Sequence, residues 1–61
     1  MSAQKIDEVM QNIKFTSQKL RAFARFDSNP NVKKLLFEAA HHLDVGVAEL
    51  EYVTTNATVS I

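Results

Sequence analysis

The strongest constraint on this chain is a single break at residues 27–31 (Asp-Ser-Asn-Pro-Asn), in a sequence that contains one proline and one glycine. The residue before a proline avoids helical angles, proline suits the first position of a helix, and asparagine or serine caps a helix well. We therefore expect one helix over residues 3–26 and a second over residues 30–53, with Asn29 or Ser28 as the cap. A connection this short places two helices side by side and antiparallel.

Apolar residues recur every seven positions in both expected helices, and this spacing favours left-handed packing of the coiled-coil type. Thr16 and Ser17 interrupt the pattern where a further apolar residue is expected. We expect the core to be completed by a second copy of the chain. The residues expected in this dimer core are Ile6, Val9, Met10, Ile13, Leu20, Phe23, Leu36, Ala39, Leu43, Gly46 and Leu50.

Gly46 lies in the interior of the second expected helix, where a glycine costs about 1 kcal/mol relative to alanine. Two interpretations stay open. A neighbouring helix approaches closely over Ala39 and Gly46, or the glycine only marks a kink.

The end of the chain, residues 54–61, changes its pattern to an alternation of apolar and polar residues rich in threonine and valine. These residues favour extended chain. We expect one domain over residues 1–61, in which residues 54–61 form an extended or flexible tail, either a strand, an arm across a partner or a frayed end.

A second set of apolar residues falls on the side of each helix away from the seven-residue repeat, at about 100° per residue. An exposed apolar surface of this kind usually marks an interface, although single exposed apolar residues are common. We expect another subunit, the tail or a partner protein to cover it. The candidate residues are Phe15, Phe26, Phe37, Val45 and Tyr52.

The chain has 61 residues and no cysteine, so a disulfide cannot reinforce its thin core. Chains of this size bury only about 60% of the surface that they expose when unfolded, and many depend on a disulfide, a metal or a partner subunit. We therefore expect an all-α protein, a hairpin that pairs into a homodimeric four-helix bundle. A trimer, a tetramer and a hetero-complex are the alternatives.

Charge is separated along the chain. Residues 14–34 hold six basic residues and one acidic residue, a net charge of +5, and the remainder holds one basic and six acidic residues, a net charge of −5. Lys33 and Lys34 begin the second helix and Glu49 and Glu51 end it, against the helix dipole. Two hairpins packed antiparallel would match opposite charges. The alternative is that these are solvated charges without a structural role.

The basic residues are also candidates for contact with nucleic acid or another anion, because phosphate binding depends on positive charge. The overall net charge of zero argues against binding that ignores sequence. The candidate residues are Lys14, Lys19, Arg21, Arg25, Lys33 and Lys34.

No pattern in the chain indicates catalysis. His41 and His42 are adjacent, so their rings diverge by about 100° on a helix and cannot bind one ion together. Glu38 and His42 have the spacing of half a metal site, but this spacing is more typical of a surface pair. One glycine is too few for a phosphate-binding loop. We expect no enzymatic activity, no metal and no cofactor.

The leading interpretation is therefore a small regulatory or protein-interaction module that acts as a homo-oligomer. The alternatives are an RNA- or DNA-binding regulator that uses the basic turn end, and a structural subunit of a larger assembly. Since neither a signal-peptide pattern nor an apolar run of about 20 residues is present, we expect a cytoplasmic protein that does not contact a membrane.

Overall fold

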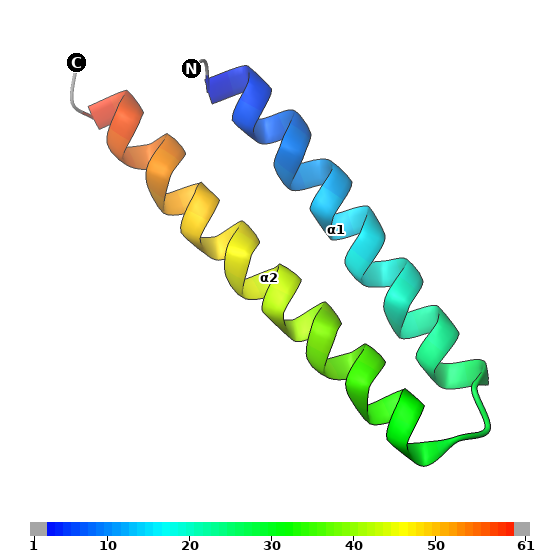
Figure 1. Ribbon diagram of the computed structural model, residues 1–61. Coiled ribbons are helices and arrows are strands. Elements are labelled where there is room, and N and C mark those ends of the chain that lie inside the picture. The colour runs from blue at the N-terminus through cyan, green and yellow to red at the C-terminus, as the bar shows by residue number, and fades with distance from the viewer. Residues whose placement is uncertain (1–2, 60–61) are drawn as a thin grey trace.

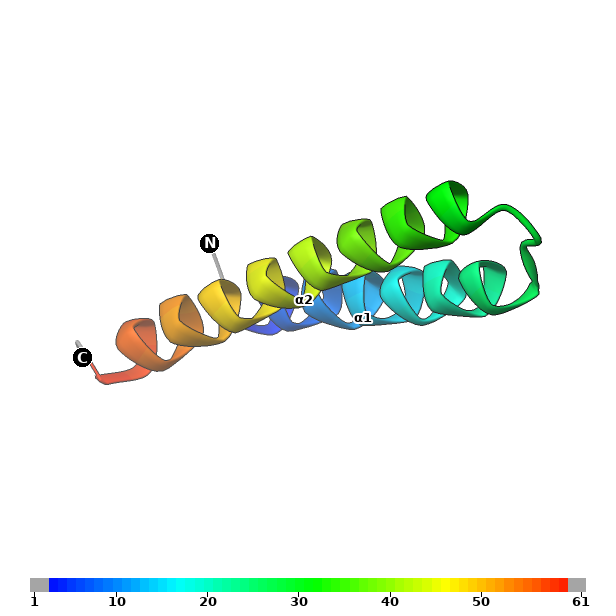
Figure 2. The same ribbon diagram turned by 90° about the horizontal axis from the view of Figure 1, so that it is seen from below.

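The computed structural model describes residues 3–59, which form two antiparallel helices, α1 (Ala3–Phe26) and α2 (Pro30–Val59). The helices lie side by side, with the first turn of α1 and the last turn of α2 at the same end (Figure 1). Viewed from below, their axes cross at a shallow angle (Figure 2). The predicted all-helical hairpin is confirmed.

The hairpin is a rod of 50 × 14 × 12 Å. Its radius of gyration is 14.4 Å, whereas a compact chain of this length has a radius of gyration of about 10.5 Å. Two helices can cover each other on one side only, and the remaining sides of each stay open.

The turn is built by side chains that bond to the backbone. Asp27 N donates to Phe23 O and closes α1, and the Asp27 carboxylate accepts a hydrogen bond from Asn29 N at 2.8 Å. Asn29 Oδ1 accepts from the backbone N–H groups of Asn31 and Val32, at 2.9 and 3.3 Å. The predicted end of α1 and the predicted cap and start of α2 are thus confirmed.

The end of α2 differs from the sequence-based expectation. The helix continues to Val59, so residues 54–59, expected as part of an extended or flexible tail, are helical. The hydroxyls of Thr54 and Thr55 both donate to Glu51 O at 2.9 Å, which satisfies these polar groups within the helix. Extending a formed helix costs far less than starting one, so a weak preference for extended chain is overridden. Residues 60–61 lie outside the described residues.

The contact between the helices follows a seven-residue repeat. Most of the side chains that are buried or partly buried alternate at steps of three and four residues, and we call this row the seam. Five are buried apolar side chains: Ile6, Met10, Ala24, Ala40 and Val47. The others are Ile13, Ser17, Leu20, Lys33, Leu36, Leu43, Leu50 and Thr54.

This core is thin for the surface that surrounds it. The solvent-accessible area is 4782 Å², whereas a compact monomer of 6.9 kDa exposes about 4,000 Å². Within residues 3–59, neither helix has an apolar stretch long enough to cross a lipid bilayer.

Candidate interaction surfaces

Two ion pairs mark one flank of the hairpin. Lys14 Nζ lies 3.6 Å from Glu51 Oε1, and the Arg21 guanidinium pairs with the Asp44 carboxylate. Each of these four residues directly follows a seam residue in the sequence, so all of them project to the same side of the seam. We call this side the charged flank.

Ser17 connects the charged flank to the seam. Its side chain is buried, with 1% exposed, and its hydroxyl donates to Asp44 Oδ1 at 2.8 Å, with the carbonyl oxygen of Ala40 at 3.3 Å. The hydroxyl also accepts a hydrogen bond from Arg21. The hydrogen bonds from Arg21 and then from Ser17 hold the pKa of the Asp44 carboxyl below its ordinary value of 3.8. This polar cluster fixes the register of α1 against α2.

The opposite flank is apolar. Its residues directly precede alternate members of the seam, namely Met10, Ser17, Ala24, Lys33, Ala40, Val47 and Thr54, so they project away from the two ion pairs. Residues that precede the other seam positions, such as Lys19 and Glu49, lie further round toward the outer side of each helix. Large apolar side chains lie exposed at its two ends, and small side chains occupy its middle. We call this surface the apolar flank; it consists of Val9, Thr16 and Phe23 from α1 and of Val32, Ala39, Gly46 and Val53 from α2.

The middle of the apolar flank presents no unsatisfied polar group. The Thr16 hydroxyl donates to Asn12 O at 3.0 Å, so it is bonded within its own helix. A Cβ atom added at Gly46 would meet nothing within 4 Å. The glycine is therefore not needed for contact with α1, and the space beside it is open to the outside of the hairpin.

The structure divides the residues that we expected in a dimer core. Most of them lie in the seam of the single hairpin: Ile6, Met10, Ile13, Leu20, Leu36, Leu43 and Leu50. The other four, Val9, Phe23, Ala39 and Gly46, belong to the apolar flank, and three of them are exposed. The seam is therefore occupied by the chain itself, and the apolar flank is left free to meet another copy.

The residues expected on one partner-binding face, four aromatic residues and one valine, do not all lie on one side of the hairpin. All five, Phe15, Phe26, Phe37, Val45 and Tyr52, are exposed. Phe15 lies roughly opposite the seam of α1, whereas Val45 and Tyr52 lie opposite the seam of α2. Because each outer side points away from the other helix, Phe15 faces away from Val45 and Tyr52.

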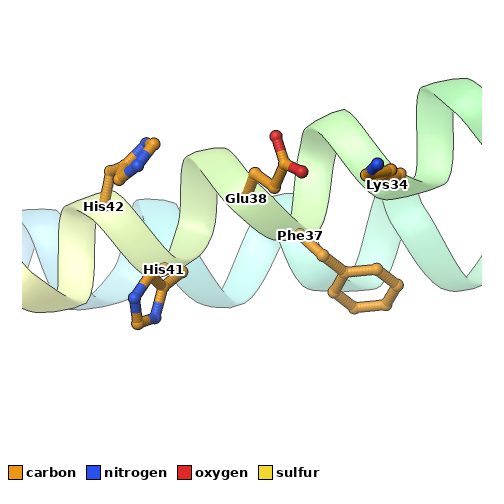
Figure 3. Close-up of a pocket in the computed structure, with 5 residues that line it drawn as sticks. All are labelled: Lys34, Phe37, Glu38, His41 and His42. Carbon is orange, nitrogen blue, oxygen red and sulfur yellow. The ribbon is translucent and has the colours of Figure 1, made fainter.

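A shallow hollow on the outer side of α2 is lined by Lys34, Phe37, Glu38, His41 and His42. All five come from one helix, and the rings of Phe37 and His41 project to one side of it while Glu38 and His42 project to the other (Figure 3). The centroids of the two histidine rings are 6.1 Å apart. Among the described residues, no cluster of three or more acidic or histidine side chains could hold a metal ion.

The basic residues are unequally engaged. Lys14 and Arg21 pair with acidic residues across the charged flank, and Lys19 Nζ lies 4.4 Å from the centroid of the Phe15 ring. Within the part of the chain that the structure describes, Arg25, Lys33 and Lys34 form no ion pair. The turn end therefore keeps these positive charges, and Phe26, at the same end, is 89% exposed.

Sequence reasoning missed the Ser17 cluster and the burial of Ala40. The expected apolar repeat has Ser17 as an interruption, although a row from Met10 to Ala24 in steps of seven residues passes through it. The partner of Ser17, Asp44, lies 27 residues away, and only the folded hairpin shows the contact.

Comparison with known proteins gives no relative. No family model matches the chain, and no curated protein and no solved structure matches it significantly. Any function is therefore inferred from the surfaces described above.

Proposed function

We propose that this protein is a small non-enzymatic interaction module that acts as a homodimer, in which two hairpins pack antiparallel into a four-helix bundle. The observation that carries the proposal is the apolar flank, which the single hairpin leaves uncovered. Phe23, Val32 and Val53 are exposed along it, and no described segment of the chain folds over them.

The exposed area supports the same proposal. The hairpin exposes about 800 Å² more than a compact monomer of its mass. Each partner in a standard protein–protein interface buries about 800 Å². Covering one flank with a second copy would therefore bring the surface of the hairpin to the value expected for a compact protein.

The charges that remain outside the two ion pairs favour an antiparallel arrangement. At the turn end, four basic residues (Lys19, Arg25, Lys33 and Lys34) face two acidic ones (Asp27 and Glu38), a net charge of +2. At the open end, Asp7, Glu8 and Glu49 oppose Lys5, a net charge of −2. Antiparallel packing of two hairpins puts opposite charges next to each other. These charges select the orientation of the dimer and add little to its affinity.

Two phenylalanines of α1 provide a matched test. Phe23 on the apolar flank and Phe15 on the outer side are exposed by 62% and 58%. We expect Phe23→Ser to shift sedimentation equilibrium toward the mass of one chain at concentrations where the wild type is dimeric. Phe15→Ser should keep the mass of the dimer, and circular dichroism should show helix in both variants.

If Phe23→Ser and Phe15→Ser sediment alike as dimers, the apolar flank is not the interface. If both are monomers like the wild type, self-association itself is disproved. The test separates the two cases because the variants remove the same side chain from two sides of one helix.

Nucleic-acid binding is the second candidate function, favoured by Arg25, Lys33 and Lys34, which form no ion pair within residues 3–59, and by the exposed ring of Phe26 at the same turn end. It predicts binding of labelled mixed-sequence RNA or DNA that weakens steeply with salt, and loss of binding in Arg25→Ala. Absence of binding at low salt, measured by fluorescence anisotropy, would eliminate this candidate.

A further inference from the structure

We propose that the second copy docks on the apolar flank with like helices facing each other, so that Ala39 meets Ala39 on the twofold axis and Val32 of each copy fills the open space at Gly46 of the other. This inference rests on the proposed homodimer and assigns its surface and register.

The pairing of like helices follows from symmetry. Two hairpins that meet face to face and run antiparallel are related by a twofold axis that lies in the interface and crosses the helices. Such an axis reverses the direction of each helix and leaves it on its own side of the interface. Therefore α1 packs against α1 of the second copy, and α2 packs against α2.

The register follows from the distribution of large and small side chains. The exposed side chains of Phe23 and Val32 lie toward the turn, and those of Val9 and Val53 lie toward the open end. The small residues Thr16 and Ala39 lie between them, seven residues from Phe23 and from Val32 respectively. An axis through this middle places the large residues of each turn end over the open end of the other copy.

With the axis at Ala39, a residue seven positions before Ala39 in one copy faces the residue seven positions after it in the other. Val32 thus faces Gly46, where an added Cβ atom would meet nothing within 4 Å.

Charge selects this register over the parallel one. Centring the axis on the middle of the hairpin sets the turn end, with its net charge of +2, against the open end, with its net charge of −2. A parallel dimer would bring both turn ends together and would face α1 with α2. Like charges at both ends would then oppose association.

Engineered cysteines test the register directly, because the chain has no cysteine of its own. At an interaxial distance of about 8 Å, which small facing residues permit, facing Cα atoms come within the roughly 4.4–6.8 Å that a disulfide spans. We expect Ala39→Cys to form a disulfide-linked dimer under mild oxidation. Val45→Cys, on the outer side of α2, is the matched control and should remain a single chain on a non-reducing gel.

A second pair of variants makes the test independent of Ala39. Val32→Cys alone and Gly46→Cys alone should not cross-link, because each residue lies 14 positions, about 21 Å, from its own copy along the bundle. An equimolar mixture of the two variants should cross-link as a mixed dimer. Subunit exchange through brief partial denaturation before oxidation forms these mixed dimers.

The outcomes separate this inference from the proposed function. Cross-linking by Ala39→Cys and by the mixture, without cross-linking by Val45→Cys, supports the register. A dimeric mass without these cross-links overturns the register and leaves the homodimer standing. A monomeric mass would overturn both proposals.

Discussion

At the scale of single residues, one polar side chain organises the contact between the helices. Ser17 occupies a seam position that an apolar residue would fill in an idealised hairpin. Its hydroxyl is bonded to Asp44 and Arg21, so burial leaves no polar atom without a partner among the described side chains. Such a group contributes less to stability than to specificity, because a helix displaced along its partner would leave the hydroxyl unbonded.

Ser17→Ala should therefore lower the free energy of unfolding by about 1 kcal/mol, the usual worth of a hydrogen bond whose partners remain. Urea denaturation of the variant at matched protein concentration measures the change. Gln18→Ala, at the exposed neighbouring position, is the control and should leave the midpoint nearly unchanged. A variant more stable than the wild type would show that the hydroxyl has no structural role.

The lowered pKa of Asp44 predicts a pH dependence of stability. A carboxyl whose pKa is lower in the folded state stabilises the fold above its unfolded pKa, and this contribution is lost as the pH falls through the folded value. The wild type should therefore lose more thermal stability between pH 5 and pH 2 than Asp44→Asn. Glu8→Gln, outside the cluster, should follow the wild type. Equal losses in the wild type and Asp44→Asn would contradict the role of the cluster.

Some residues of the seam can be assigned from the sequence, and others cannot. The seven-residue spacing of Leu36, Leu43 and Leu50 identifies them as seam residues from the sequence alone. The choice between Ala39 and Ala40 cannot be made in this way, because adjacent alanines differ only by a rotation of about 100°. Asp44 and the Ala40 carbonyl, to which Ser17 donates, lie on the other helix, and only the fold brings them together.

At the scale of the elements, the turn was predictable because its signals are strong and local. Proline fixes its own φ angle and lacks an N–H group, and asparagine offers a side-chain acceptor, so Asn29 and Pro30 set the start of α2 almost without competition. The end of α2 has no such signal. Thr54 and Thr55 have only a weak preference for extended chain, which the preceding helix overrides.

Asn29→Ala should lower the free energy of unfolding by about 1 kcal/mol, because the backbone N–H groups of Asn31 and Val32 lose their acceptor. Thermal unfolding followed by circular dichroism measures the change. Ser28→Ala removes a polar side chain from the same turn and serves as the control. If Ser28→Ala destabilises the hairpin as much as Asn29→Ala, Asn29 is not the residue that caps α2.

At the scale of the whole molecule, the two flanks of the hairpin differ in kind. The charged flank satisfies itself through Lys14–Glu51 and Arg21–Asp44, whereas the apolar flank has no counterpart within the described chain. The sequence predicts that apolar residues exceed what a hairpin can bury. It does not separate seam from flank, because that depends on which side of each helix meets the other.

The mass of the wild-type protein in solution is the most direct test of the homodimer. Sedimentation equilibrium over a wide concentration range should give twice the chain mass of 6.9 kDa. High salt should weaken the dimer modestly, because the apolar flank supplies the affinity and exposed charges contribute little. A folded chain that sediments at 6.9 kDa at every concentration would contradict the homodimer and show that a second copy does not cover the apolar flank.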